Sequence, residues 1–380
     1  MSVRAAVLGC GMVGATMVRD LSAGPDFDVT GVDVSETNLR KLADLPRVKM
    51  ECADLSDTNE LRTLVRRFDI LLGALPSRLG FQSLRTIIEA GKPYCDITFM
   101  SEDAMDLDSL ARQNGVTAVV DCGVSPGLSN LCIGHAHARL DRTDRAAIYV
   151  GGLPKARYWP FQYKAPFAPG DVIEEYTRPA RLRVNGVTVV RPALSEPEII
   201  DFPGIGTLEA FNTDGLRSLL TTIDIPNMLE KTLRYPGHRE LMGAFREAGL
   251  FDTQEIEVGG CRVRPRDLLA RLLFPKWTYE PGDEEFTILR VDVEGAEHDR
   301  GVRYIFDLYD EYDAAARTSS MARTTAFPCT IMARLVAKGQ FTDKGVVPLE
   351  LAARQEGLFD TMSRELARRG VTLNQRVEPI

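Results

Sequence analysis

Apolar runs long enough to cross a membrane are missing from this sequence. A membrane span needs about 18 consecutive apolar residues, and no stretch of the 380 residues approaches that length. The N-terminus also lacks the pattern of a signal peptide, because an apolar strand begins almost at once at Val3. We therefore expect a cytoplasmic protein with no membrane partner.

Basic stripes are missing as well. The formal net charge is −8 at pH 7, whereas nucleic-acid binding needs a positively charged surface. The small arginine clusters around 62–67 and 368–369 lie on predicted helices, where we interpret them as solvated faces. We therefore expect no nucleic-acid partner.

Cysteine and histidine show no metal-binding pattern. The seven cysteines are odd in number and scattered, which is typical of reduced thiols in the cytoplasm. Four of them have apolar neighbours and are expected to be small buried residues. These four are Cys10, Cys95, Cys122 and Cys132. His135 and His137 are two positions apart and do not share a helix face, so we interpret them as surface or packing residues and expect no metal site.

The first strand and the turn after it form the most informative motif. Apolar residues at 3–8 lead into Gly9-Cys10-Gly11-Met12-Val13-Gly14, and a helical pattern follows. This order is the dinucleotide-binding fingerprint. Its first glycine permits a tight turn, its second lets the backbone approach a pyrophosphate, and its third lets helix and strand pack closely. Because N–H groups at a helix start attract phosphates, we predict cofactor contacts at Gly9, Gly11, Met12, Val13 and Gly14.

An acid lies at the distance that this fingerprint requires. A second strand is predicted at 28–34, and Asp33 near its end is placed to bind the hydroxyls of the adenosine ribose. A 2′-phosphate there would meet a like charge, and no arginine directly follows Asp33, so NAD is favoured over NADP. The alternative is a glycine turn in an unrelated α/β domain, with Asp33 as a solvated strand end.

Six predicted strands alternate with helices over the first 120 residues. They lie near 3–8, 28–34, 48–51, 69–76, 93–96 and 116–120. This alternation predicts a doubly wound parallel sheet of the Rossmann type, whose ligands bind at the carboxyl ends of the strands. At that edge we predict cofactor contacts from Asp54, Leu55, Ala74, Leu75 and Pro76. Asp54 is also interpreted as an N-cap acid before the next helix.

A loop rich in glycine and proline at 121–130 marks the exit from this domain. Beyond about residue 144, short alternating runs are broken by Pro and Gly, and the stretches 286–294 and 302–308 predict an antiparallel hairpin. We expect an NAD-binding domain at 1–125. A second, α+β domain built on an antiparallel sheet is expected at 126–324, for substrate binding and dimerisation. A tail at about 325–380 is expected to return to the first domain.

Several stretches carry a family resemblance. Besides the glycine motif, they are 96–100, 121–130, 172–176, 209–216, 232–238 and 318–325. The most specific are the Pro-Gly loop at 126–127 and the run Leu233-Arg234-Tyr235-Pro236-Gly237-His238. On these residues the chain resembles the saccharopine dehydrogenase-like family, and most closely its lysine 6-dehydrogenase branch.

The resemblance implies an NAD-dependent oxidation of an amine on an amino-acid side chain. For lysine the products would be 2-aminoadipate 6-semialdehyde and ammonia. The resemblance also implies a homodimer formed through the second domain. Saccharopine-forming members tend to carry an acid where this chain has Ser125 and an arginine where it has Thr213. Both departures weaken a saccharopine assignment, because saccharopine needs extra carboxylate anchors.

Such an oxidation needs a base within hydrogen-bond reach of the amine and a proton shuttle. His238 is a candidate shuttle because its ordinary pKa is nearest neutrality, or it packs at the start of a helix. Asp96 is a candidate to hold the side-chain ammonium, or it caps a strand. Lys164 and Tyr176 are candidate bases, or they are ordinary surface residues of the second domain.

Substrate recognition needs a guanidinium for the α-carboxylate and an acid for the α-ammonium. Arg234 is the first choice for the guanidinium and Arg217 the second, while Glu175 or Asp214 supplies the acid. Surface ion pairing is the alternative for each. Two further substrate contacts are predicted at the strand edge, Thr98 and Ser125.

Two other functions remain open. One is the reverse reaction, an NAD(P)H-dependent reductive joining of an amine to a carbonyl, as in saccharopine or carboxynorspermidine formation. The other is a non-catalytic regulator that binds NAD without turnover.

Overall fold

The structure is a computed structural model that describes residues 2–167, 169–280 and 282–380. The chain forms two compact units, which are described separately. Unit 1 comprises Met1–Asp141, Arg217–Ile223 and Ala322–Leu373, and unit 2 comprises Arg142–Leu216, Asp224–Met321 and Asn374–Ile380.

Unit 1 is built on a parallel sheet of seven strands in the order β17-β6-β5-β4-β1-β2-β3. The strands are β1 (Val3–Leu8), β2 (Phe27–Asp33), β3 (Val48–Cys52), β4 (Ile70–Gly73), β5 (Tyr94–Asp96), β6 (Thr117–Val120) and β17 (Gly345–Pro348). All six predicted strands are present, and β17 adds a seventh by pairing in parallel with β6. The central strands are apolar and buried because helices cover both faces of the sheet. The predicted Rossmann fold is confirmed.

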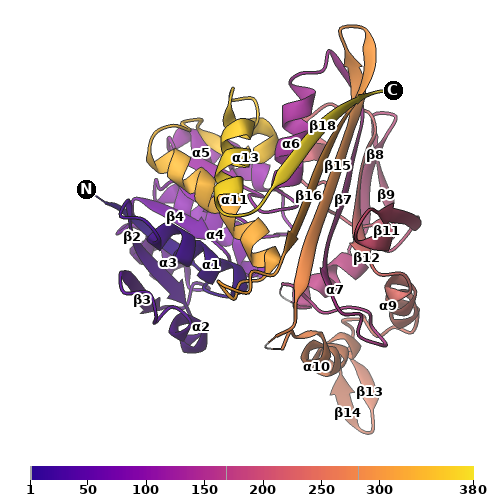
Figure 1. Cartoon of the computed structure of the whole chain (residues 1–380). Coiled ribbons are helices and arrows are strands. Elements are labelled where there is room, and N and C mark those ends of the chain that lie inside the picture. Colours follow the sequence, from indigo (N-terminus) through magenta and orange to yellow (C-terminus); the bar gives the residue numbers. More distant parts are fainter. Residues whose placement is uncertain (1, 168, 281) are drawn as a thin grey trace. The chain divides into compact units, whose positions relative to one another are not determined.

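Helices make up most of the rest of unit 1. They are α1 (Met12–Ser22), α2 (Glu36–Arg40), α3 (Thr58–Val65), α4 (Ser77–Glu89), the 3₁₀ helix η1 (Ala104–Leu107), α5 (Asp108–Gln113), α6 (Leu128–His137), α8 (Leu219–Thr222), α11 (Ser320–Ala337), α12 (Leu349–Ala352) and α13 (Leu358–Arg368). Figure 1 shows α11 and α13, in orange and yellow, among the indigo and purple elements of the N-terminal sheet. In the described part of the chain, no helix combines the length and apolarity that a bilayer crossing requires.

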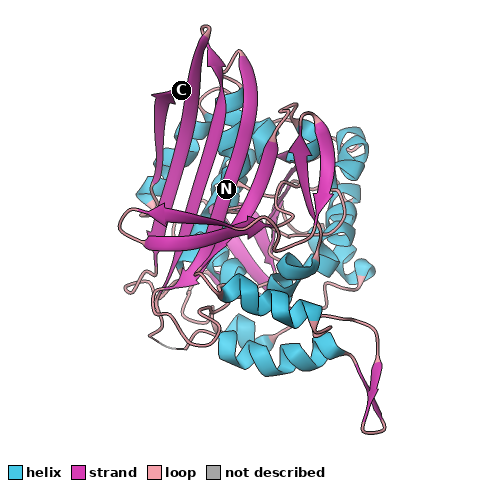
Figure 2. Cartoon of the chain, turned by 90° about the vertical axis from the view of Figure 1, so that its right-hand side faces the viewer, coloured by secondary structure: helices cyan, strands magenta, loops and turns pink. Residues whose placement is uncertain are grey.

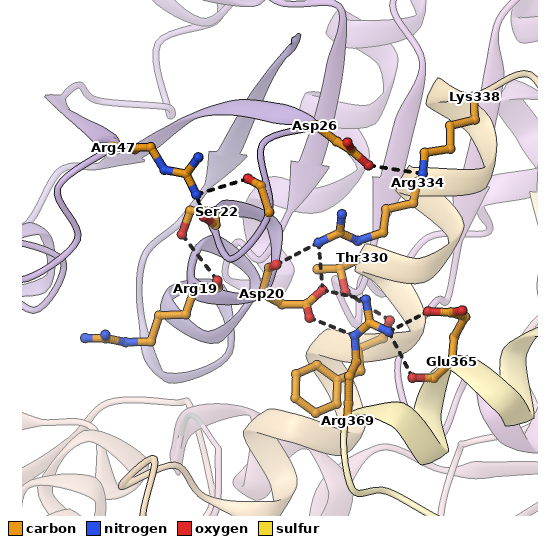
Figure 3. A network of polar contacts seen from close by, with 12 residues as sticks. Arg19, Asp20, Ser22, Asp26, Arg47, Thr330, Arg334, Lys338, Glu365 and Arg369 are labelled. Carbon is orange, nitrogen blue, oxygen red and sulfur yellow. Dashed lines mark hydrogen bonds and ion pairs between the residues drawn. The ribbon is translucent and has the colours of Figure 1, made fainter.

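Charged side chains join the C-terminal helices to α1. The carboxylate of Asp20 accepts from Arg369 Nε at 2.7 Å, and the main-chain carbonyl of Asp20 accepts from Arg334 at 2.7 Å (Figure 3). Arg369, the C-cap residue of α13, also pairs with Glu365 on that helix at 3.0 Å. The guanidinium of Arg334 lies over the ring of Phe27. The sequence between 322 and 373 therefore completes the first unit through specific polar contacts.

Unit 2 is built on a nine-stranded sheet in the order β10-β11-β12-β7-β15-β16-β18, with β8 and β9 attached at β12. The strands are β7 (Arg142–Pro154), β8 (Ala180–Val184), β9 (Val187–Arg191), β10 (Glu198–Phe202), β11 (Gly206–Asn212), β12 (Met228–Arg234), β15 (Glu285–Glu297), β16 (Arg300–Glu311) and β18 (Leu373–Pro379). A separate small hairpin consists of β13 (Ile256–Val258) and β14 (Cys261–Val263). The helices are α7 (Pro169–Thr177), α9 (His238–Glu247) and α10 (Pro265–Trp277). Figure 2 shows the long strands of the sheet side by side.

The predicted antiparallel sheet needs one correction. The hairpin of β15 and β16 is antiparallel and longer than predicted, with Phe286 opposite Glu311 and Glu297 opposite Arg300. β7 and β12, however, run parallel. The chain between them contains two helices and four further strands, so it can cross over and re-enter the sheet in the same direction. The unit is α+β with a mixed sheet.

The unit boundaries differ from the expected ones in three places. Unit 1 extends to residue 141 because α6 packs against α12. Residues 217–223 belong to unit 1, where Thr222 donates to Glu350 at 2.7 Å. Residues 374–380 belong to unit 2 because β18 joins the sheet beside β16.

Candidate functional site

The glycine loop after β1 has two positions that only glycine can occupy and one that faces open space. Gly9 has φ +90°, and a Cβ there would overlap the carbonyl oxygen of Ala74. A Cβ on Gly14 would overlap the carbonyl oxygen of Gly9. A Cβ on Gly11 would meet no atom of the described chain within 4 Å. Gly9 and Gly14 therefore hold the turn against helix and strand, and Gly11 leaves room for a phosphate to approach the backbone.

The start of α1 completes this phosphate cradle. Gly11 is the N-cap residue, and no side chain caps the helix. The first N–H groups of an uncapped helix, together with its dipole, attract anions. The backbone of Met12 and Val13 therefore suits an anion such as a pyrophosphate, and their contact with a dinucleotide stays a prediction.

Asp33 ends β2 beside the glycine loop. Its carboxylate accepts from the backbone N–H of Cys10 at 2.7 Å and of Ser35 at 2.7 Å, and from the Asn38 amide at 3.2 Å. These bonds fix the carboxylate at the carboxyl end of the strand and use three of its roughly four lone pairs, which leaves one on Oδ1 for a ribose hydroxyl. Burial and the Asp33 carboxylate raise the pKa of Cys10 to about 12, so this thiol stays protonated.

The segment after β3 needs a correction. The helix α3 is capped by Asp57, whose carboxylate accepts from the N–H of Asn59 at 2.8 Å. Asp54 is therefore wrong as the N-cap and instead accepts from Ser56 N–H at 2.9 Å, in a turn three residues earlier. Leu55 is buried in the core, so its side chain is committed to packing.

The segment after β4 lies beside the glycine loop. Ala74 N–H donates to the carbonyl of Leu8 at 2.8 Å. Leu75 is half-buried and Pro76 is exposed, and Pro76 precedes α4 without a side-chain cap. A second uncapped helix start therefore opens at the same edge of the sheet.

Asp96 at the end of β5 is fully buried. Its Oδ1 accepts from Thr98 Oγ1 at 2.6 Å and from Thr98 N–H at 3.0 Å. Burial raises the pKa of Asp96 to about 6, although the bonds to Thr98 favour the ionised form. The carboxyl therefore ties the strand end to the following loop and also titrates near neutrality. Asp96 and Thr98 lie together at the predicted edge.

Arg217 is held by unit 1 itself. Its guanidinium donates to the carbonyl of Met100, lies 3.5 Å from Asp121 Oδ1, and stacks 4.8 Å from the ring centre of Phe99. Burial raises the pKa of Asp121, and the nearby Arg217 opposes that shift. These contacts favour the ion-pairing alternative for Arg217. Sequence reasoning did not single out Asp121 as its partner.

Ser125 lies in the loop before α6. Its side chain is half-buried, and its hydroxyl accepts from the Ser129 hydroxyl at 3.0 Å. The turn closes tightly at Gly127, which has φ +143° and where a Cβ would overlap the carbonyl of Gly123.

His135 is buried and stacked on Phe359 at 3.8 Å between ring centres, so the packing interpretation of His135 is confirmed. The four predicted core cysteines are buried as expected.

Two predicted site residues of unit 2, Glu175 and Tyr176, accept hydrogen bonds from the guanidinium of a third, Arg234. Arg234 is 2% exposed and donates to Glu175 Oε2 at 2.8 Å and to the Tyr176 hydroxyl at 3.3 Å. It also stacks 4.6 Å from the ring centre of Tyr163. Burial raises the pKa of Glu175, and Arg234 opposes that shift. We call this group, with His238, the Arg234 cluster.

His238 is buried at the start of α9 within this cluster. Its Nδ1 lies 2.7 Å from the carbonyl of Phe161 and its Nε2 lies 2.8 Å from the Tyr176 hydroxyl. Because a carbonyl only accepts, Nδ1 carries the proton and Nε2 accepts from Tyr176. Burial and the Arg234 charge lower the pKa of His238 to about 3. The imidazole is therefore neutral at physiological pH, which favours the packing alternative over a proton shuttle.

Tyr176 and Lys164 are also held by other groups. Burial raises the pKa of Tyr176 to about 12, so its hydroxyl is a donor rather than a base at neutral pH. Lys164 is paired with Asp283, and its ammonium lies 4.4 Å from the ring centre of Tyr158. Neither residue is an exposed surface group.

The two predicted acids for the α-ammonium differ in their partners. Asp214 accepts from Arg181 through both oxygens at 2.8 Å, which favours ion pairing for this residue. Glu175 is half-buried and paired with Arg234 through Oε2, and it lies in the cluster.

Sequence reasoning missed a buried acid, Glu230 on β12. Its Oε2 accepts from Thr213 Oγ1 at 2.6 Å and from Gly215 N–H at 3.0 Å. Burial raises the pKa of Glu230 to about 8, the bond from Thr213 opposes this shift, and the charge of Glu175 adds to it. A signal was available, since Glu230, Thr232 and Arg234 alternate along one face of a strand.

Two family models match the chain. The saccharopine dehydrogenase NADP binding domain matches residues 5–119, and the saccharopine dehydrogenase C-terminal domain matches residues 123–371. The chain belongs to the saccharopine dehydrogenase family. Its membership confirms the resemblance seen in the sequence, and residues 5–119 match the dinucleotide-binding domain of that family.

Individual relatives are distant. Alpha-aminoadipic semialdehyde synthase of Arabidopsis thaliana is 26% identical over 264 residues, which cover 63% of this chain and 24% of that protein. Saccharopine dehydrogenase [NADP(+), L-glutamate-forming] of Pyricularia oryzae is 21% identical, with 85% of this chain and 88% of that protein covered. The solved structure of apo saccharopine dehydrogenase (L-Glu forming) from Saccharomyces cerevisiae has TM-score 0.81 at 17% identity and covers 99% of this chain and 100% of that one. The fold of this family member is thus that of the yeast protein.

The chain spans about a quarter of the first curated relatives, 24% of the Arabidopsis thaliana protein and 28% of the Rattus norvegicus one. It matches one part of these longer proteins.

Proposed function

We propose that this protein catalyses the NAD-dependent oxidative deamination of a primary amine on an amino-acid side chain, with L-lysine as the favoured substrate. An alkylammonium, NAD⁺ and water would give an aldehyde, NADH, ammonium and one proton. The carbon loses a hydride and becomes an imine, which water then hydrolyses. For lysine the product is 2-aminoadipate 6-semialdehyde.

The charge around Thr213 carries this proposal. Its hydroxyl donates to Glu230 and lies 2.8 Å from the hydroxyl of Thr232. Asp214 and Glu175 both act on the same carboxyl. Within the described residues, the acid beside Thr213 that has no guanidinium partner is Glu230, which suits a cationic amine. The two guanidinium groups nearby, Arg181 and Arg234, are paired with Asp214 and Glu175, so the additional carboxylates of saccharopine would need further cations here.

For the cofactor, we propose NAD rather than NADP. The family model is named for NADP, but the carboxylate of Asp33 is fixed at the end of β2. A 2′-phosphate at this position would meet a negative charge. A bound NAD supplies the hydride acceptor. The glycine loop binds its pyrophosphate, Asp33 its ribose hydroxyls, and the segments at Asp54 and Ala74 flank it.

We assign the α-ammonium of the substrate to Glu175 and its α-carboxylate to Arg234. Glu175 is half-buried and oriented by Arg234. Arg234 has a planar fork that matches a carboxylate. Asp96 is the acid–base candidate of unit 1, because its pKa is raised to about 6 by burial and a base near the working pH is most effective.

Two broader properties are also proposed. We expect a homodimer formed through unit 2, where strands β9 and β10 expose Val187, Val190 and Ile199. Sedimentation of the purified protein tests the proposed dimer.

A reducing, cytoplasmic location is favoured because all seven cysteines are free thiols that form no disulfide with one another.

The absorbance of NADH tests the function. L-lysine and NAD added to the protein at alkaline pH should produce NADH, and NADP should give a weaker signal. Consumption of NADH only when both an amine and an oxo-acid are present would instead support the reductive joining reaction. Binding of the dinucleotide without any absorbance change would support a regulator.

A further inference from the structure

Unit 2 contains three neighbouring acids, and two of them have a guanidinium partner. Asp214 is paired with Arg181, and Glu175 is paired with Arg234. Glu230 is 3% exposed, and both of its hydrogen bonds come from neutral donors, Thr213 and Gly215. A buried carboxylate without a cation is costly, so this position needs an explanation.

The carboxyl of Glu230 is also held in one orientation. Both donors reach Oε2, and among the described residues no hydrogen bond reaches Oε1. A Cβ on Gly215 would overlap the Cδ atom of Glu230, so a larger residue there would displace the carboxyl. The Thr213 hydroxyl is itself fixed by Thr232 at 2.8 Å. One oxygen is therefore anchored and the other is left to accept a donor.

We infer that Glu230 Oε1 is the acceptor for the side-chain ammonium of the substrate, and that Glu230 releases its own proton when this cation binds. The inference rests on the proposed function, because it takes the substrate to be an amino acid with an amine on its side chain. Glu230 would then distinguish such a substrate from an amino acid with an uncharged side chain.

The proton count follows from the charges around the carboxyl. Burial and the carboxylates of Glu175 and Asp214 raise the pKa of Glu230 to about 8, while Thr213 and the N–H of Gly215 oppose that shift. With this pKa, the carboxyl of Glu230 is mostly protonated at pH 7. An ammonium at Oε1 adds a positive charge at contact distance and favours the carboxylate. Because lysine keeps its side-chain charge at this pH, binding releases close to one proton at pH 7 and almost none above pH 9.

Calorimetric titration of the full chain saturated with NADH tests this count. With NADH bound, lysine cannot be oxidised, so the heat reports binding alone. Repeating the titration in buffers of different ionisation enthalpy gives the number of protons released. L-lysine should release close to one proton at pH 7. L-norleucine, which has the same chain length without the side-chain ammonium, should bind more weakly and release none.

Two variants complete the test. Glu230→Gln imitates the protonated carboxyl and keeps an acceptor for Thr213, so we expect it to fold, as circular dichroism would show. It should bind lysine about tenfold to a hundredfold more weakly, without proton release, and should bind norleucine as the parent protein does. Glu209→Gln alters another buried acid, which pairs with Arg239 on α9, and should retain the proton release.

The results separate this inference from the proposed function. If Glu230→Gln binds lysine with unchanged affinity and proton release while the parent protein oxidises lysine, the inference is wrong and the function stands. Equal proton release by norleucine would also reject it. If lysine is not oxidised but n-butylammonium binds with proton release that Glu230→Gln abolishes, the function fails and the cation site stands. If neither amine binds, both are rejected.

Discussion

The glycine loop of unit 1 and the Arg234 cluster of unit 2 are built on different physical principles. In the loop, Gly9 and Gly14 are needed because backbone atoms approach too closely for any side chain. In the cluster, long charged and aromatic side chains fill the space, and each is held by a partner from another element. The first kind of site is local in sequence, and the second is assembled from distant segments.

This difference decides how each site responds to change. A backbone contact cannot relax by rotating a side chain, so a single methyl group in the loop displaces a strand or a helix. A side-chain cluster can lose one group and keep its backbone, but the partner of that group is then left in a buried environment.

The largest effect is expected for Gly14→Ala. Its Cβ would overlap the carbonyl of Gly9, which is backbone and cannot move away. We expect unit 1 not to reach its native packing and NAD binding to be lost. Thermal unfolding and a fluorescence titration with NADH measure both effects.

Gly11→Ala is the matched control for the loop. Its Cβ would lie in open space with respect to the described chain, so unfolding should be nearly unchanged while dinucleotide affinity falls. If the two variants unfolded at the same temperature, the steric distinction between these glycines would be wrong.

The next effect in size is expected for Arg234→Ala. Removing the guanidinium leaves Glu175 without its partner and Tyr176 without a donor, at a cost of about 3 kcal/mol in the free energy of unfolding. Arg234→Lys should restore only part of this, because an ammonium lacks the fork. Urea unfolding measures the change, and the KM for lysine should rise in parallel.

An exposed pair provides the control. Arg40 pairs with Glu36 on α2, and the Arg40 side chain is 77% exposed. Arg40→Ala should therefore change the unfolding free energy by less than about 0.5 kcal/mol. A similar cost for the two arginines would show that the Arg234 cluster has no special stability.

The same contrast explains what the sequence could predict. The glycine loop, Asp33 and the alternating strands are short-range patterns, and each of them matches the structure. The partners of Arg217 and Asp214 could not be predicted, because Asp121 and Arg181 come from other elements. Long-range pairing is set by the fold rather than by spacing.

Three further errors have separate causes. The N-cap role was given to Asp54, although Asp57 stands three residues later and fits the same rule. The parallel pair of β7 and β12 was missed because alternation along a strand does not reveal the direction of its neighbour. Glu230 was missed because a charged residue in a strand suggests an exposed face.

A pH-dependent effect is expected for Asp96→Asn. The folded state raises the pKa of Asp96 from 3.8 to about 6, chiefly through burial, so folding binds a proton. Stability is therefore highest below about pH 4, falls as the pH rises towards 6, and stays at the lower level above it. The Asn variant cannot ionise and should be more stable than the parent at pH 8 by up to about 3 kcal/mol. Urea unfolding at pH 4 and pH 8 measures the difference.

The control for Asp96 is Asp54, a carboxyl whose pKa is lowered rather than raised. Hydrogen bonds from Ser56 lower the pKa of the exposed Asp54, so Asp54→Asn should not stabilise the protein at either pH. If Asp96→Asn gave the same difference at pH 4 and pH 8, burial of the ionised carboxyl would not be its cause.

The smallest effect is expected for Asp33→Ala, and it concerns selectivity rather than folding. The variant removes the acceptor for the ribose hydroxyls and the negative charge that opposes a 2′-phosphate. NAD should bind about tenfold more weakly, as expected for lost hydrogen bonds to a charged group, while NADP binding should hold or improve. Separate titrations with NADH and NADPH measure the ratio of the two affinities.

Asp33 also accepts from the N–H of Cys10 and of Ser35, so its removal could disturb the loop rather than the selectivity. Asp33→Asn separates the two effects, because the amide oxygen keeps one of these two backbone bonds while the charge and the acceptor for the other are lost. If charge sets the selectivity, the Asn variant should gain NADPH affinity while its unfolding temperature falls less than that of Asp33→Ala. An unchanged NADH to NADPH ratio in both variants would show that another group selects the cofactor, and the glycine loop would then bind dinucleotides without distinguishing them.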